Sequence, residues 1–284
     1  MKKKPFGINK TLIPVIGQGT WEMPEQGPER DEAAAAIKAG IEHGLVHIDT
    51  AEMYGAGKSE ELIGKVIKDF RREDLFIVSK VLPDNATYQG TITACEQSLS
   101  RLGTDYLDCY LLHWHGKHPL KDTMRALEKL VTDGKIRSLG VSNFDMYDLE
   151  EAAGHLEKEK ISCNQVLYNL YERGIERKLI SYCKQKSISV VAYTPFGQRP
   201  LPDKSTADGV ALAGIAAKHN ATVAQVILSF LTREDNVFTI PKAAKSHHAA
   251  DNAAAGDLEL DSDDIASINK AFPAPTKDVP LATL

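Results

Sequence analysis

The feature that most constrains the fold of this 284-residue chain is a regular alternation of short apolar runs with longer amphipathic segments. Eight runs rich in β-branched and aromatic residues are predicted to be strands: 15–21, 45–49, 75–81, 106–113, 136–142, 161–166, 188–194 and 237–241. Eight segments with helical periodicity follow them in turn: 29–42, 59–69, 88–102, 122–132, 145–156, 175–186, 208–219 and 247–256. A hairpin is expected at residues 6–14 and a C-terminal helix at 262–271.

Strands that alternate with helices are typical of parallel βα units, and eight units in about 250 residues predict an α/β protein of the (β/α)8, or TIM, barrel class. Several predicted strands are continuous apolar runs, such as residues 75–78 and 190–192, as expected for strands buried on both faces. No long linker interrupts the pattern. We therefore expect residues 1–284 to form one barrel domain, with a doubly wound sheet as the alternative fold.

Composition and charge narrow the partners of the chain. With 34 Lys and Arg against 39 Asp and Glu, its net charge of −5 argues against nucleic acid as the main partner. No apolar run approaches the roughly 18 residues of a membrane span, and no export signal is visible. The four cysteines are widely spaced and show no zinc-like pairing, which favours a reduced, cytoplasmic protein. The expected state is a monomer that acts on a small molecule.

Two glycine-containing segments look like nucleotide-binding motifs but fail on spacing. The run from Gly55 to Ser59 resembles a P-loop, yet Glu52 stands where the first glycine would be needed. We interpret the segment instead as a loop with Ser59 as helix N-cap and Glu60 and Glu61 in the first turn. A Rossmann motif is also absent, because Glu22 follows Gly17-Gln18-Gly19 where its third glycine would fall.

Polar residues at predicted strand ends indicate where the chemistry lies, since TIM barrels carry their active sites at that end. Asp49, Lys80 and His113 stand there, and Tyr54 follows Asp49 by five residues. A buried lysine needs a partner, which Asp49 could supply. The Lys80 charge would lower the pKa of the Tyr54 phenol from about 10, and burial would partly offset this. The group suits a general acid acting on a carbonyl that His113 orients.

Seven motifs then stand in an order and spacing that resemble the aldo-keto reductase family over nearly the whole chain. They are Gly17-Gln18-Gly19-Thr20-Trp21, Ile48-Asp49-Thr50-Ala51-Glu52-Met53-Tyr54-Gly55, Ser79-Lys80, Leu112-His113-Trp114, Gly140-Val141-Ser142-Asn143-Phe144, Asn164-Gln165 and Ile240-Pro241-Lys242. The resemblance implies a catalytic tetrad of Asp49, Tyr54, Lys80 and His113 with Tyr54 as proton donor. It also implies a barrel that binds extended NADPH or NADP+ without a Rossmann motif.

The resemblance further implies a set of cofactor contacts. Ser142, Asn143 and Gln165 would hold the nicotinamide carboxamide, and Tyr193 would stack on its ring. Lys242 would bind phosphate and Asn252 would contact adenine. The remaining expected contacts are Gly19, Thr20, Trp21, Asp49, Thr194, Pro195, Phe196, Gly197, Ile240, Pro241, Ala243 and His248. His248 and Ala243 replace an arginine and a serine common in the family, so we expect NADPH to be preferred less strictly and NADH to be tolerated.

A metal site is the alternative interpretation of His113, His115 and His118, which form an H-x-H-x-x-H pattern. A metal-dependent barrel needs further His or Asp ligands at other strand ends. Those positions hold Lys80, Asn143, Gln165 and Tyr193, so no metal is expected.

The resemblance implies the NADPH-dependent reduction of small aldehydes and ketones to alcohols. The overall similarity, including residues 17–23 and 48–54, looks closest to bacterial reductases of methylglyoxal and related aldehydes, so methylglyoxal-type and aromatic aldehydes are the leading expected substrates. Trp21, Tyr54, His113 and Trp114 are the expected substrate-binding residues, and the two tryptophans would give an apolar wall. The loop at residues 114–120 is short, which predicts an open, permissive pocket. The alternative is an NADPH-binding redox sensor or structural barrel with little turnover, against which the complete tetrad argues.

Overall fold

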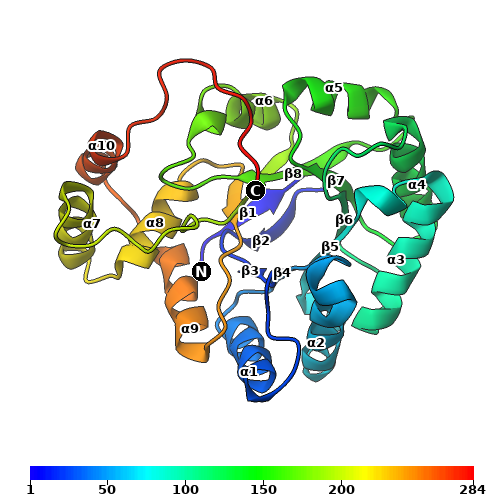
Figure 1. The fold of residues 1–284 in the computed structure, drawn as a ribbon, viewed down its shortest axis with the longest axis horizontal. Coiled ribbons are helices and arrows are strands. Elements are labelled where there is room, and N and C mark those ends of the chain that lie inside the picture. The colour runs from blue at the N-terminus through cyan, green and yellow to red at the C-terminus, as the bar shows by residue number, and fades with distance from the viewer.

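The computed structural model describes residues 1–284 and contains one eight-stranded parallel sheet that curls into a barrel (Figure 1). Its strands are β3 (Gln18–Gly19), β4 (His47–Asp49), β5 (Phe76–Val81), β6 (Cys109–Leu112), β7 (Leu139–Ser142), β8 (Ile161–Leu167), β9 (Ser189–Tyr193) and β10 (Val237–Thr239). The barrel closes between its first and last strands, where Ile16 pairs with Thr239 and Gly19 with Lys242. The predicted (β/α)8 fold is confirmed.

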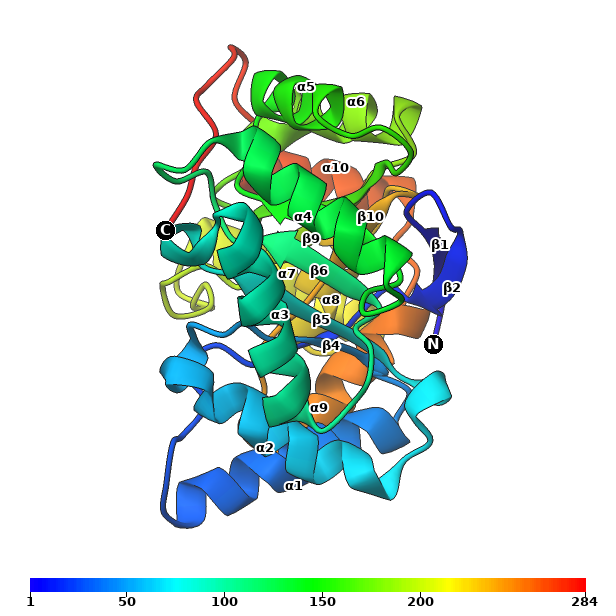
Figure 2. The same ribbon diagram turned by 90° about the vertical axis from the view of Figure 1, so that its right-hand side faces the viewer.

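Helices cover the outside of the barrel, as Figures 1 and 2 show. They are α1 (Pro28–Glu42), α2 (Lys58–Val66), α3 (Tyr88–Leu102), α4 (Leu120–Thr132), α5 (Met146–Gly154), α6 (Leu179–Gln185), α7 (Ala207–Lys218), α8 (Val223–Leu231), α9 (Ser246–Ala254) and α10 (Ser262–Ala271). None of them is both long enough and apolar enough to cross a membrane.

Helix α8 is absent from the sequence prediction, which placed one helix between the last two strands. Its sequence, VAQVILSFL, is a short run that is apolar almost throughout, and such a run does not by itself distinguish a buried helix from a buried strand. The available signal was its capping box, in which Thr222 and Gln225 satisfy each other's backbone N–H groups. The connection between β9 and β10 therefore contains two helices, α7 and α8, rather than one.

The predicted hairpin is formed by β1 (Lys3–Phe6) and β2 (Thr11–Pro14) and closes the N-terminal end of the barrel (Figure 2). Phe6 reaches inside and packs edge-on against Phe76 and Phe238, with ring centroids 4.9 and 5.4 Å apart. At the opposite end, the segment after α10 crosses the barrel mouth (Figure 1). Asp278 of this segment forms ion pairs with Arg177 and Lys178. Because the hairpin closes the N-terminal end, the end of the barrel where the strands finish is the more open one.

Candidate active site

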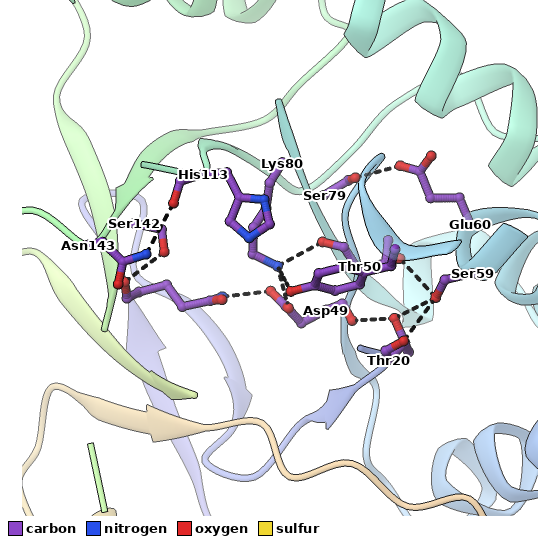
Figure 3. A network of polar contacts seen from close by, with 12 residues as sticks. Thr20, Asp49, Thr50, Ser59, Glu60, Ser79, Lys80, His113, Ser142 and Asn143 are labelled. Carbon is purple, nitrogen blue, oxygen red and sulfur yellow. Dashed lines mark hydrogen bonds and ion pairs between the residues drawn. The ribbon is translucent and has the colours of Figure 1, made fainter. Parts of the chain in front are cut away.

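Three polar residues predicted at strand ends, together with Tyr54 from the loop that follows one of them, meet at the C-terminal end of the barrel. Asp49 ends β4, Lys80 lies in β5, and His113 directly follows β6. Tyr54 is carried over them by the loop after β4, in a short 3-10 turn at Tyr54–Gly57. Parallel strands present their ends side by side, so three consecutive strands place Asp49, Lys80 and His113 in one cluster (Figure 3). Tyr54 joins them by accepting a hydrogen bond from Lys80.

Lys80 is the centre of this cluster and is completely buried. Its ammonium donates hydrogen bonds to Asp49 Oδ1 at 2.5 Å, to the Thr50 carbonyl at 2.8 Å and to Tyr54 Oη at 3.1 Å. An ammonium has three N–H donors, and all three are therefore used. Because the phenol oxygen accepts from Lys80, the Tyr54 O–H remains available to donate elsewhere.

The electrostatics of the cluster keep Tyr54 protonated. Burial is the largest effect and raises the pKa of the Tyr54 phenol, Lys80 opposes it, and the negative Asp49 adds to it. Burial alone would lower the pKa of Lys80, but the adjoining Asp49 and Tyr54 raise it. The predicted net lowering of the tyrosine pKa is thus wrong for this structure, because burial of the phenol outweighs the charge of Lys80, and Asp49 beside Lys80 adds to the effect of burial.

His113 is held neutral beside the tyrosine. Its ring lies edge-on to the Tyr54 ring at 5.8 Å and next to Trp114 at 4.8 Å. Burial, and then the charge of Lys80, lower the pKa of His113 to about 3. A neutral imidazole carries one N–H donor, which suits a hydrogen bond to a carbonyl oxygen.

Asp49, Tyr54 and His113 border a cavity of about 680 Å³, and most of the predicted cofactor and substrate contacts line its wall. The predicted residues that line it are Gly19, Thr20, Trp21, Asp49, Tyr54, His113, Trp114, Ser142, Asn143, Gln165, Tyr193, Thr194, Pro195, Phe196, Gly197, Ile240 and Lys242. Four predicted contacts do not line it: Pro241, Ala243, His248 and Asn252. Their assigned roles, like those of the lining residues, remain predictions.

The sequence profile of the aldo/keto reductase family matches residues 15–272, which is most of the chain. This protein belongs to the aldo/keto reductase family. The family predicted from the seven motifs is therefore confirmed.

Individual relatives agree with this assignment. Methylglyoxal reductase YeaE of Escherichia coli (strain K12) is 45% identical over 263 residues, which cover 93% of this chain and 92% of the relative. Glyoxal reductase of Bacillus subtilis (strain 168) is 43% identical over 263 residues, covering 92% and 90%. A crystal structure of an aldo-keto reductase from Klebsiella pneumoniae in complex with NADPH has a TM-score of 0.92 and 43% identity, with 100% of both chains covered.

Behind the tetrad of this reductase lies a chain of hydroxyl groups that the sequence did not predict (Figure 3). Thr50 Oγ1 donates to Ser59 Oγ at 3.3 Å, Ser59 Oγ donates to Thr20 Oγ1 at 2.9 Å, and Thr20 Oγ1 donates to the Asp49 carbonyl at 2.8 Å. The chain joins the ends of β3 and β4 to the start of α2. It therefore fixes the backbone of Asp49 and Thr50, the two residues that hold Lys80.

Ser59 was expected to cap α2, and this prediction is wrong. The helix begins at Lys58 with Gly57 as N-cap and no side-chain capping bond. Gly55, Ala56 and Gly57 all have positive φ angles, of 59°, 51° and 91°, which turn the chain so that Ser59 faces the barrel. Glu60 and Glu61 do lie in the first turn, as predicted.

Two buried glutamates near the tetrad were also not predicted as site residues. Glu60 accepts hydrogen bonds from Ser79 Oγ and Arg101 Nε, both at 2.6 Å, and so fixes the residue before Lys80. Glu52 accepts from the Leu82 backbone N–H at 2.6 Å and fixes the loop after β5. Only burial distinguishes these two acids from exposed ones, and burial is known only from the folded structure. The sequence therefore carried no signal for them.

Amide and hydroxyl groups connect the tetrad to the next wall of the cavity. Gln165 Nε2 donates to Asp49 Oδ2 at 2.7 Å, and Ser142 Oγ donates to the Gln165 carbonyl at 2.9 Å. Tyr193 Oη donates to Asn143 Oδ1 at 2.8 Å, and Asn143 Nδ2 donates to the His113 carbonyl at 3.3 Å. The residues predicted to hold the nicotinamide therefore form one connected layer with the catalytic group.

The remaining sequence features fall outside this layer. His115 packs near the ring of Phe144, and His118 Nε2 lies 3.2 Å from the Asp84 carbonyl, so neither joins His113. No group of His, Cys, Asp or Glu is arranged to hold a metal ion. Four cavity residues were missed by sequence reasoning: Glu22, Met53, Gln198 and Leu284. They lie in loops and in the terminal segment; Met53 stands within one of the seven motifs, and no periodicity or motif marks the other three.

Proposed function

We propose that this protein reduces small aldehydes and ketones to alcohols with NADPH as cofactor, methylglyoxal-type and aromatic aldehydes being its preferred substrates. The observation that carries this proposal is the contact between Lys80 and Tyr54 over Asp49, with neutral His113 beside it, on the wall of a 680 Å³ cavity. The arrangement supplies one free phenolic proton and one imidazole N–H to a carbonyl oxygen.

The residues present fit NADPH. Tyr54 and Lys242 line the same cavity, so one bound molecule could contact both the catalytic group and a cation. Amide groups of Asn143 and Gln165 suit a carboxamide, and the Tyr193 ring offers a surface for stacking. Lys242 suits a phosphate. Several solved relatives, including the Klebsiella pneumoniae enzyme, are in complex with NADPH or NADP, which supports the same cofactor here.

The proposed proton transfer starts from the phenolic proton of Tyr54, which no neighbouring group accepts. Tyr54 keeps its proton at neutral pH and donates it to the carbonyl oxygen as that oxygen gains negative charge. Lys80 then faces the resulting phenolate and stabilises it by its hydrogen bond. His113 orients the carbonyl by donating its N–H. NADPH, when bound, supplies the hydride.

The substrate end of the cavity favours small, uncharged carbonyls. Trp21, Met53 and Trp114 line it, and each is about 36–40% exposed, so the mouth presents accessible apolar surface. The names of the two curated relatives, a methylglyoxal reductase and a glyoxal reductase, support small dicarbonyls as candidates.

The test is the substitution Tyr54→Phe. We expect turnover of methylglyoxal to fall by at least about 100-fold, because general acid catalysis contributes that much or more. The Kd for NADPH, measured by calorimetry, should change less than about twofold. Tyr147→Phe is the matched control, since Tyr147 is 73% exposed and lies outside the cavity.

Two outcomes would contradict the proposal. Survival of turnover in the Tyr54→Phe protein would show that another group donates the proton. A wild-type protein that binds NADPH but turns over none of a panel of aldehydes and ketones would instead support the sensor or structural alternative. Running the panel with NADPH and NADH in parallel also measures the strictness of cofactor choice.

A further inference from the structure

The cavity contains an acidic residue that faces its phosphate-binding cation. Glu22 follows Trp21 in the loop after β3, and its Oε2 lies 3.7 Å from Lys242 Nζ. Lys242 Nζ also donates a hydrogen bond to the Glu22 backbone carbonyl at 3.5 Å. Both side chains line the cavity. The cation expected to meet the cofactor is therefore already paired with an acid of the same wall.

The barrel fixes this pair in place. Gly19 pairs with Lys242 across the seam where the first and last strands meet, and the Gly19 N–H donates to the Pro241 carbonyl at 3.1 Å. Glu22 has a φ angle of 54°, in the left-handed region that residues other than glycine seldom adopt. A strained backbone of this kind persists only where the surrounding structure holds it. The backbone of Glu22 is therefore held next to Lys242, within hydrogen-bond reach of its ammonium.

Glu22 changes the net charge of the cavity wall. Among the 21 residues that line it, Lys242 is the only lysine or arginine. The acids among them are Glu22 and Asp49, and Asp49 is neutralised by Lys80. With Glu22 beside Lys242, the wall offers no net positive charge to a ligand that carries several phosphate charges. Electrostatic complementarity between protein and cofactor is correspondingly low.

We propose that Glu22 sets the cofactor affinity of this enzyme: its carboxylate offsets the charge of Lys242 and weakens the binding of NADPH and NADP+. The inference rests on the proposed function in so far as the cofactor carries phosphates. Its consequence is that removal of the Glu22 charge tightens binding. The gain is larger for NADPH than for NADH, because NADPH carries more negative charge.

The test is the Kd of NADPH measured by titration calorimetry for wild type and Glu22→Gln at low ionic strength. We expect Glu22→Gln to lower the Kd about fivefold, the size of effect typical of one exposed charge near its partner. Raising the salt concentration should shrink this gain, since both side chains are exposed to solvent. In a Lys242→Met background, the same substitution should give a smaller gain because its partner is gone.

Glu25→Gln is the matched control. Glu25 lies three residues further along the same loop, pairs with Lys58 Nζ at 2.5 Å and does not line the cavity. It should leave the Kd within about twofold of wild type, because its charge is paired with Lys58 rather than with Lys242 and lies outside the cavity wall. An equal tightening in both variants would show a general charge effect and overturn the role of Glu22.

The remaining outcomes separate the inference from the proposed function. An unchanged Kd in Glu22→Gln, with normal binding by wild type, would overturn the inference alone. Failure of every protein, wild type included, to bind NADPH would overturn the proposed cofactor and the inference together.

Discussion

At the scale of single residues, each hydrogen-bond donor of Lys80 has one acceptor. Its three N–H groups donate to Asp49, Thr50 and Tyr54, so the ammonium is fixed in orientation. That arrangement leaves the phenolic O–H of Tyr54 free to donate, as its proposed role of proton donor requires. The geometry therefore separates the proposed proton donor from the residues that hold it in place.

The pH dependence of reduction follows from the two shifted pKa values. In the proposed mechanism Tyr54 must be protonated to act, and burial raises its pKa above the usual value. His113, with its pKa lowered to about 3, is neutral throughout the accessible range. We therefore expect kcat for an aromatic aldehyde at saturating NADPH to stay level from about pH 6 to about pH 9 and to fall only above about pH 10. An alkaline limb centred near neutrality would contradict this.

At the scale of elements, strand ends were predictable and the loops behind them were not. Asp49, Lys80 and His113 could be found because polar residues interrupt apolar runs at fixed places in a repeating pattern. Ser59 was misassigned because its direction depends on three successive positive φ angles, one of them at an alanine. Glycine adopts such angles readily but alanine does not, so sequence propensity does not predict a turn that continues through Ala56.

The hydroxyl chain that Ser59 joins gives a prediction at this scale. In Ser59→Ala the Thr50 and Thr20 hydroxyls lose their common partner, and the Thr50 carbonyl that holds Lys80 is less firmly placed. We expect a loss of about 1–2 kcal/mol in unfolding free energy and a fall of about threefold or more in kcat, since small displacements of positioned groups are costly. The KM for NADPH should change little.

Ser100→Ala on α3 serves as the control, because Ser100 is exposed, lies near the C-terminal end of that helix and does not line the cavity. Steady-state kinetics and urea unfolding of both variants give the comparison. A Ser59→Ala protein with lower stability but wild-type kcat would limit the hydroxyl chain to a structural role.

At the scale of the whole molecule, the number and order of the strands could be read from the sequence, but the consequences of closure could not. The first strand was expected over residues 15–21, whereas regular pairing in β3 covers only Gln18–Gly19 and isolated bridges complete the seam. Glu22 meets Lys242, and Leu284 reaches the cavity, only because the two ends of the sheet join and the terminal segment crosses the mouth. Contacts between residues more than 200 positions apart leave no local pattern.

Closure also buries His47 inside the barrel, where it makes the protein sensitive to acid. The ring is fully buried between Phe6 and Phe76, and neither nitrogen has a hydrogen-bond partner. Burial, and then the charge of Lys80, lower the pKa of His47 to about 3. The unfolded chain binds a proton at its usual pKa of about 6.5, so the stability gained from keeping this ring neutral is present above that pH and is lost as pH falls from 6.5 towards 3.

Replacing this residue should therefore remove part of the acid sensitivity. The difference in unfolding free energy between pH 8 and pH 5 contains about 2 kcal/mol from His47, and His47→Leu should lower that difference by this amount while leaving stability at pH 8 similar, because the ring makes no hydrogen bond to lose. Urea unfolding at the two pH values measures it. His43→Gln, at an exposed position, should leave the difference unchanged. If His47→Leu loses as much stability as wild type between pH 8 and pH 5, the imidazole is not the group that binds the extra proton on unfolding, and the acid sensitivity lies with His113 or with the carboxylates.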